Sequence, residues 1–201
     1  IITYNGAMIK SCLSEEVLYH RPIENDLALD VLNLFRERGW YIQAYIDDTL
    51  YVEELNDKAQ QYGKLAGVKP YPIGDRLYTI TGAPTKLLSI ADPDDIGAIW
   101  RVVEERFPGR VYIAQSKPHY LEMAHPDVNK GKALGFLADK LNITRDEVMA
   151  IGDSINDLDM IEYAGWGVAM GNAHERVKAV AQAVTLGNDE DGVAEAIIKY
   201  A

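Results

Sequence analysis

A short apolar run, Val148–Ile151, leads directly into an acidic loop, Gly152–Asp157, that reads Gly-Asp-Ser-Ile-Asn-Asp. Such a run, bounded by turn residues, is typical of a buried parallel strand. The following residues predict a helix at about 157–163, a strand at Gly167–Met170 and a helix at His174–Ala181. Because strands alternate with helices here, the C-terminal part of the chain is predicted to be an open α/β sheet.

The middle of the chain follows a different pattern. Apolar residues recur at helical spacing over Glu24–Arg38, and Gly39 is a natural residue to end that helix. Two β-prone runs, Trp40–Ile46 and Thr49–Glu53, predict a hairpin. A second hairpin is predicted over residues 110–124. Helices mixed with hairpins indicate an α+β unit built on an antiparallel sheet.

These patterns predict two domains. Residues 14–125 are expected to form an inserted α+β domain. Residues 1–13 and 126–201 are expected to form one α/β domain from both ends of the chain. The length of 201 residues suits one large domain or two small ones.

Charge and composition exclude several classes of partner. The chain has 20 basic and 31 acidic residues and a formal net charge of −11, which opposes binding to nucleic-acid phosphates. No apolar run reaches the roughly 18 residues of a membrane span, and no secretory signal pattern opens the sequence. A single cysteine, Cys12, fits a reducing compartment. We therefore expect a cytoplasmic protein with neither nucleic-acid nor membrane partners.

The acidic loop carries the clearest chemical signal. It lies at the carboxyl end of a predicted strand, where open α/β sheets bind their ligands. Asp153, Asn156 and Asp157 offer hard oxygen ligands on a tight loop, and such ligands suit Mg²⁺. The alternative is a helix N-terminus at which acids serve only as caps and dipole partners.

Two neighbouring segments bear on that choice. Lys130 begins a predicted helix, where a cation opposes the helix dipole, so it could instead neutralise a phosphate or a carboxylate. The turn Met170–Ala173 could bring backbone N–H groups towards the loop. Read alone, Lys130 could also be a solvated surface residue, and the turn could be ordinary loop chemistry.

Three motifs together resemble the haloacid dehalogenase superfamily, in particular its Cof-type phosphatases with a IIB-type cap. They are Asn129-Lys130-Gly131, the Gly152–Met160 segment and the Gly167–Ala173 segment. The opening Ile2–Ala7 also resembles the strand that precedes the cap. The resemblance implies an α/β Rossmann-like core interrupted by an α+β cap domain, with Mg²⁺ as cofactor and a small phosphorylated metabolite as substrate.

The resemblance also implies roles for individual residues. Lys130 would stabilise the phosphoryl group and its nucleophile. Asp153 and Asp157 would hold Mg²⁺, with help from Asn156, and Asn5 and Asn172 would face the site. Substrate contacts would lie on cap loops, where we expect Tyr45, Asp47 or His119.

One motif of that family has no counterpart in this sequence. The family's Asp-x-Asp-Gly-Thr motif supplies the nucleophile, and no such motif occurs here. We therefore expect an N-terminally truncated chain that is inactive by itself, and whose activity returns with the upstream sequence. Sheet edges left unpaired by the missing strands would favour self-association.

Three functions follow from these features. The leading hypothesis is a Mg²⁺-dependent phosphatase that works through an aspartyl-phosphate intermediate. The alternatives are a phosphomutase of the same fold and a non-catalytic module that binds a phosphorylated ligand.

Overall fold

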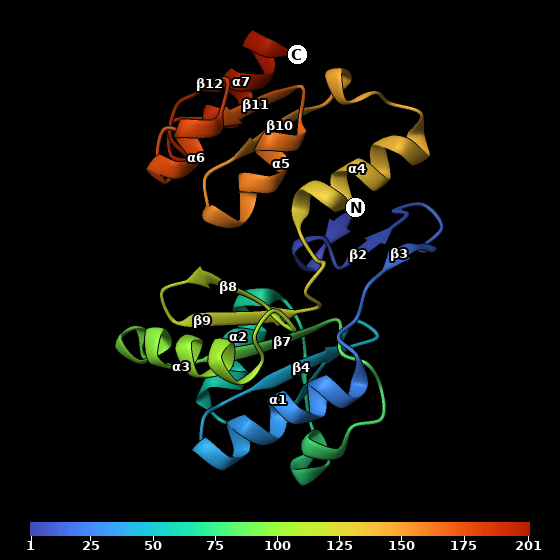
Figure 1. Cartoon of the computed structure of the whole chain (residues 1–201), viewed down its shortest axis with the longest axis vertical. Helices are drawn as coiled ribbons and strands as arrows, with labels where there is room; N and C mark the ends of the chain where they lie inside the picture. The colour runs from blue at the N-terminus through green and yellow to red at the C-terminus, as the bar shows by residue number, and fades with distance from the viewer. The chain divides into compact units, whose positions relative to one another are not determined.

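The computed structural model describes all 201 residues and divides into two units (Figure 1). The first unit contains Ile1–Tyr19 and Val128–Ala201, and the second contains His20–Asp127. The chain therefore leaves the first unit six residues later than the predicted boundary at residues 13 and 14. The reason is a strand, β3 (Val17–His20), that adds to a sheet of the first unit. That the units act as core and cap remains a prediction.

The first unit contains a parallel three-stranded sheet in the order β10-β11-β12. Its strands are β10 (Met149–Gly152), β11 (Trp166–Ala169) and β12 (Ala183–Val184). The helices α5 (Leu158–Tyr163) and α6 (Glu175–Val180) connect them, because parallel neighbours need a crossover. Ala150, Ile161 and Val177 lie in the shared core. The predicted α/β fold class is confirmed by this sheet.

Two further helices belong to the first unit, α4 (Lys130–Leu141) and α7 (Gly192–Tyr200). The start of α4 at Lys130 agrees with the helix start that the sequence predicted there. The bounds of α4 follow from two asparagines. The side chain of Asn129 accepts the backbone N–H of Lys132, and Asn142 ends the helix in the left-handed conformation (φ 56°).

A small antiparallel sheet precedes the second unit in the sequence. It consists of β1 (Ile2–Thr3), β2 (Met8–Lys10) and β3 in that order. The opening segment Ile2–Ala7, which resembles a strand in sequence, is extended only over β1, because Tyr4, Asn5 and Gly6 all have positive φ (53°, 56° and 103°). These residues form a 3₁₀ turn, η1 (Tyr4–Gly6), and return the chain into β2, which the sequence did not predict.

The second unit is built on a six-stranded sheet in the order β6-β5-β4-β7-β9-β8. Its strands are β4 (Gln43–Ile46), β5 (Thr49–Val52), β6 (Pro70–Pro72), β7 (Lys86–Ile90), β8 (Tyr112–Lys117) and β9 (Tyr120–Ala124). Both predicted hairpins are present, as β4–β5 and β8–β9. Only β5 and β6 run parallel, joined through α2 (Asp57–Ala66).

Two longer helices, α1 (Asn25–Arg38) and α3 (Pro93–Arg106), complete the second unit. Leu27, Val31 and Phe35 place the apolar stripe of α1 in a large core that also contains sheet residues such as Leu87. A 3₁₀ segment, η2 (Gly74–Thr79), contributes to the same core and was not predicted. This unit therefore has an apolar core of its own.

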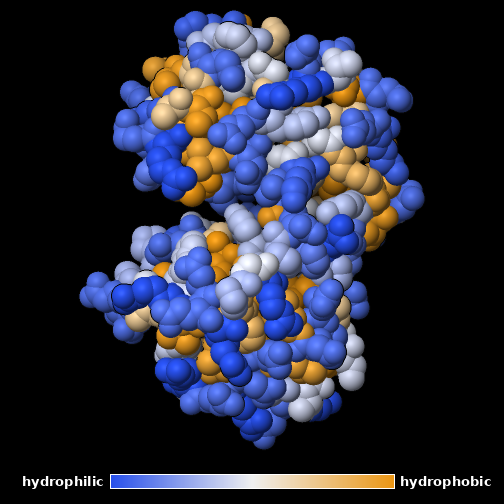
Figure 2. Space-filling model, viewed as in Figure 1, coloured by the Kyte–Doolittle hydropathy of each residue, from blue (hydrophilic) through white to orange (hydrophobic).

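Hydrophilic and apolar residues alternate over the visible surface of each unit (Figure 2). Apolar side chains are exposed near the end of the first unit, at Val184, Leu186, Val193, Ile197 and Ile198. None of the helices combines the length and the apolar character that crossing a bilayer requires.

Candidate active site

The acidic loop is held closed by its own last residue. One carboxylate oxygen of Asp157, Oδ2, accepts the backbone N–H groups of Asp153 and Ser154, each at 3.0 Å. The side chain of Asp157 is buried. A Cβ on Gly152 would lie 2.6 Å from the Cβ of Asp157, so the loop can close this tightly only with glycine there. The sequence thus folds these residues into a compact turn at the end of β10.

Lys130 reaches this loop from the first residue of α4. Its Nζ lies 2.5 Å from Asp157 Oδ1, and the two side chains are 28% and 7% exposed. A cation at a helix N-terminus is locally unfavourable, since it opposes the helix dipole. The nearby carboxylate offsets that cost, and Lys130 is therefore part of the loop's electrostatics and not a solvated surface residue.

Asp153 is held by two side chains. Its Oδ1 accepts the hydroxyl of Ser154 at 3.0 Å, and its Oδ2 accepts the amide of Asn172 at 3.0 Å. The other end of the Asn172 amide accepts the backbone N–H of Asn188 at 2.9 Å. The turn after β11 therefore contacts the loop through a side-chain amide and also through backbone N–H groups, as the sequence had suggested. Met170 donates its N–H to the carbonyl of Gly152 at 2.9 Å, and His174 donates its N–H to the carbonyl of Asp153 at 3.0 Å.

Asn156 connects the loop to the start of the chain. Its Nδ2 donates to Oδ1 of Asn5 at 3.2 Å, across 151 positions of sequence. Its own Oδ1 is buried and has no hydrogen-bond partner. Asn5 is presented by the left-handed turn at Tyr4–Gly6, a conformation that costs energy in residues other than glycine. This strained turn places the Asn5 amide beside the acidic loop.

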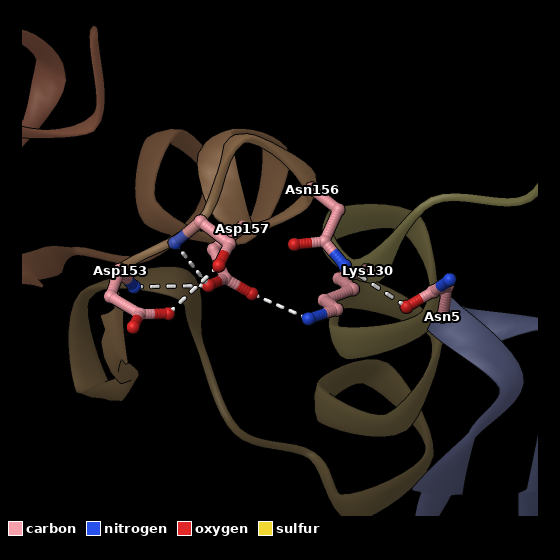
Figure 3. A network of polar contacts seen from close by, with 6 residues as sticks. Asn5, Lys130, Asp153, Asn156 and Asp157 are labelled. Carbon is pink, nitrogen blue, oxygen red and sulfur yellow. Dashed lines mark hydrogen bonds and ion pairs between the residues drawn. The ribbon is translucent and has the colours of Figure 1, made fainter. Parts of the chain in front are cut away.

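The structure thus brings together all six residues that were predicted to face the site, and Figure 3 labels five of them. Lys130 and Asp153 approach Asp157 from different sides, and the amide nitrogen of Asn156 points towards Asn5. Two contacts were not anticipated from the sequence: the Ser154 hydroxyl on Asp153 and the backbone of Asn188 on Asn172. Neither residue type carries a signal for such a role, because serine and asparagine are ordinary loop residues.

The oxygen atoms of the loop suit a hard cation to different degrees. Both oxygens of Asp157 already accept hydrogen bonds or the Lys130 ammonium. Asp153 keeps a lone pair on each oxygen, and the Asn156 carbonyl has no partner. No three His, Cys, Asp or Glu side chains converge anywhere in the chain in a way that could hold a metal. Asp153 and Asn156 fit Mg²⁺ as part of a coordination shell, and Asp157 fits a supporting position.

Comparison with known proteins places this site in a family. The sequence pattern of the haloacid dehalogenase-like hydrolases matches residues 1–197. The chain belongs to that family. Phosphatase YwpJ of Bacillus subtilis is 32% identical over 224 residues, covering 96% of this chain and 76% of its own. The predicted Cof-type hydrolase is thereby confirmed, and the chain is a phosphatase-like hydrolase.

Two further relatives support the assignment. A haloacid dehalogenase-like hydrolase from Bacteroides thetaiotaomicron has a similar structure, with a TM-score of 0.87 and 35% identity over 98% of this chain and 74% of its own. The protein named 5-amino-6-(5-phospho-D-ribitylamino)uracil phosphatase YcsE, from Bacillus subtilis, is 49% identical over 85 residues, which are 42% of this chain and 34% of that protein. The hydrolase fold thus extends over nearly the whole chain.

The predicted substrate contacts of this hydrolase lie in the second unit and differ in character. Tyr45 was expected on a loop, but it lies in strand β4, is buried, and donates its hydroxyl to that of Tyr62 at 3.0 Å. Burial raises the pKa of Tyr45, so it is a neutral packing residue. Asp47 is exposed in the β4–β5 turn, and His119 packs edge-on against Tyr120. Only Asp47 and His119 have the loop position that was predicted.

Proposed function

We propose that this hydrolase cleaves the phosphate monoester of a small metabolite with the help of Mg²⁺. The observation that supports this proposal is the shared use of Asp157, whose two oxygens hold the Lys130 ammonium and the backbone of the Asp153 loop. The buried carboxylate of Asp157 therefore fixes the position of the Lys130 ammonium. It also fixes the loop that carries the more accessible carboxylate of Asp153. A dianionic phosphate needs positive charge beside it, particularly in a chain of net charge −11. Lys130 and a divalent cation held by the open carboxylate would supply that charge.

Each residue would contribute a distinct part of the chemistry. Lys130 would offset negative charge on the phosphoryl oxygens. Asp153 and Asn156 would hold Mg²⁺, which would supply further charge compensation and orient the phosphate. Asp157 would fix the positions of Lys130 and the loop, and Asn5 would orient the Asn156 amide. All these groups lie in the first unit.

The nucleophile of this proposal comes from outside the 201 residues. In the proposed reaction the first aspartate of an Asp-x-Asp motif attacks phosphorus and the P–O bond to the substrate breaks. The second aspartic acid of that motif donates its proton to the alkoxide, which leaves as the alcohol. Water then hydrolyses the aspartyl phosphate to free aspartate and inorganic phosphate. The sequence contains no Asp-x-Asp-Gly-Thr motif, so Lys130 and Asp153 make up only part of the site.

The substrate is proposed only as a class. The relative YcsE is named for a phosphorylated ribitylamino-uracil, which is a small phosphate monoester. Its 49% identity to this chain extends over 42% of the chain, so that individual substrate is not carried over. A small phosphorylated metabolite agrees with the negative charge, which disfavours nucleic acid as a partner.

Location and assembly complete the proposal. The exposed free thiol of Cys12 suits a reducing compartment such as the cytoplasm. Strand β10 is paired with β11 on one side and lies at the edge of its sheet. Backbone groups on such an edge can pair with another chain, and we propose self-association of the 201-residue chain through β10.

Turnover of p-nitrophenyl phosphate with Mg²⁺ tests the function. We expect no turnover by the 201-residue chain, and turnover by a version extended at Ile1 with an Asp-x-Asp-containing segment from a matched relative. In the extended version, Lys130→Ala should lower kcat/KM by about 100-fold or more. Lys178→Ala is the matched control, since Lys178 pairs with Glu175 on α6.

Other results would contradict the proposal. Turnover by the 201-residue chain would contradict the proposal that the nucleophile comes from outside these residues. An extended version that binds inorganic phosphate without any turnover would favour the non-catalytic binding module. Equal losses in the Lys130 and Lys178 variants would remove Lys130 from the chemistry.

A further inference from the structure

The amide of Asn172 links Asp153 to a second loop. Nδ2 of Asn172 donates to Asp153 Oδ2, and Oδ1 accepts the backbone N–H of Asn188. An amide side chain has a donor end and an acceptor end, so these two bonds fix its orientation. The contact spans three segments: the loop after β10, the turn after β11 and the loop before α7.

The second loop is itself well ordered by hydrogen bonds. Glu190 accepts the backbone N–H of Gly187 at 3.1 Å, and the Thr185 hydroxyl donates to the carbonyl of Gly192 at 2.8 Å. Gly171 donates its N–H to the carbonyl of Leu186 at 2.9 Å. The backbone N–H that Asn172 accepts is therefore a fixed point, against which the Asn172 amide can be held.

Asp153 needs such a fixed partner. Its loop backbone is held by Asp157, but its carboxylate is only partly buried, and an exposed side chain changes rotamer within nanoseconds. Ser154 holds Oδ1 from within the same loop. The His174 N–H bonds to the backbone carbonyl of Asp153, whereas Asn172, in the turn after β11, bonds to its carboxylate.

We propose that Asn172 is a positioning residue, which holds the Asp153 carboxylate in one rotamer so that its remaining lone pairs face a bound divalent cation. The metal part of this inference rests on the proposed function, whereas the rotamer part does not. Residues that hydrogen-bond to a metal ligand and orient it, without touching the metal, typically contribute about 10- to 100-fold to metal affinity.

Mn²⁺ alone is the probe for the metal part, measured by calorimetry or by the electron paramagnetic resonance of free Mn²⁺. We expect Asn172→Ala to weaken Mn²⁺ binding about 10-fold or more, with thermal unfolding nearly unchanged because Asn172 is exposed. Asn172→Asp should weaken it also, since a carboxylate cannot donate to Asp153. Asn188→Ala is the matched control: it keeps the backbone N–H that Asn172 accepts.

The rotamer part is measured without metal. Three-bond couplings between backbone nuclei and Cγ of Asp153 should indicate a single χ1 rotamer in the wild-type chain and averaging in Asn172→Ala. Unchanged couplings in that variant would overturn the inference even if the wild-type chain binds no Mn²⁺. Absence of Mn²⁺ binding together with altered couplings would count against the proposed metal and support the positioning role. Equal effects in Asn188→Ala would also overturn it.

Discussion

Lys130 and Asp157 form a short ion pair in which one partner is nearly inaccessible and the other is partly open to solvent. The buried carboxylate satisfies two backbone N–H groups as well as the ammonium. Its loss therefore removes several interactions at once, whereas the loss of Lys130 removes one. This asymmetry separates the roles of the two residues in stability experiments.

Asp157→Ala should destabilise the first unit by about 3–5 kcal/mol, because two partly buried N–H groups of the loop and the Lys130 ammonium lose their acceptor together. Lys130→Met should cost less, about 2–3 kcal/mol, since it leaves the buried Asp157 carboxylate without its cation but keeps both N–H bonds to it. Urea unfolding followed by amide resonances of the first unit measures both. Asp159→Ala, an exposed acid on α5, is the control and should change little. Equal costs for the Asp157 and Lys130 variants would contradict this ranking.

Replacing two helical glycines by alanine should change the stability of the protein in opposite directions. A Cβ on Gly131 in α4 would lie 2.3 Å from the carbonyl oxygen of Asp159, whereas a Cβ on Gly97 in α3 meets no atom within 4 Å. Gly131→Ala should destabilise by about 2–3 kcal/mol through overpacking. Gly97→Ala should stabilise by about 0.5–1 kcal/mol through helix propensity. Thermal unfolding of both variants checks the signs; a neutral Gly131→Ala would show that α4 and α5 can separate.

Two ion pairs of the second unit should differ in their contribution. Lys86 and Glu122 lie 3.5 Å apart with side chains only 12% exposed, whereas Arg36 and Asp75 are 48% and 78% exposed. Lys86→Met should cost about 2–3 kcal/mol, because it leaves the Glu122 charge buried. Arg36→Met should cost less than about 1 kcal/mol. Chemical denaturation of the second unit measures the free energy of unfolding of both variants. A larger loss in Arg36→Met than in Lys86→Met would contradict the argument from burial.

Glu147 gives a prediction about pH. Hydrogen bonds from the backbone N–H and the hydroxyl of Thr144 lower its pKa from the usual 4.5. A lowered pKa in the folded state stabilises the fold above the unfolded-state pKa, and the effect is lost as the pH falls through the folded value. The wild-type chain should therefore lose more stability than Glu147→Gln as the pH falls from about 6 to 3. Parallel pH profiles of the melting temperature would contradict this.

Local signals explain what could be predicted from the sequence. The bounds of α4 follow from Asn129 and Asn142, which cap it through their own side chain or backbone. The acidic loop was identifiable because its residues are adjacent in sequence and follow an apolar run. Strand β10 and helix α5 could be placed to within a residue or so for the same reason.

Non-local contacts explain what could not be predicted. Strand β6 has only three residues, two of them proline, and exists through its pairing with β5. The left-handed conformation of Asn5 is readable from its residue type, but that of Tyr4 is not. The contacts Asn5–Asn156 and Asn172–Asp153 depend on how distant segments are folded together. Tyr45 was expected among the substrate contacts on cap loops, whereas its position in β4 buries it.

The order of the segments in the two units has a consequence for biosynthesis. The second unit is continuous in sequence, whereas the first is assembled from Ile1–Tyr19 and Val128–Ala201. At ribosomal elongation rates, the early segment waits on the order of ten seconds before its partners emerge. Its apolar residues, such as Met8 and Ile9, are buried in the finished protein and unprotected until then. The inserted unit can therefore fold before the segment that carries Lys130 and Asp153 has been synthesised, and the unit that contains these residues is completed later.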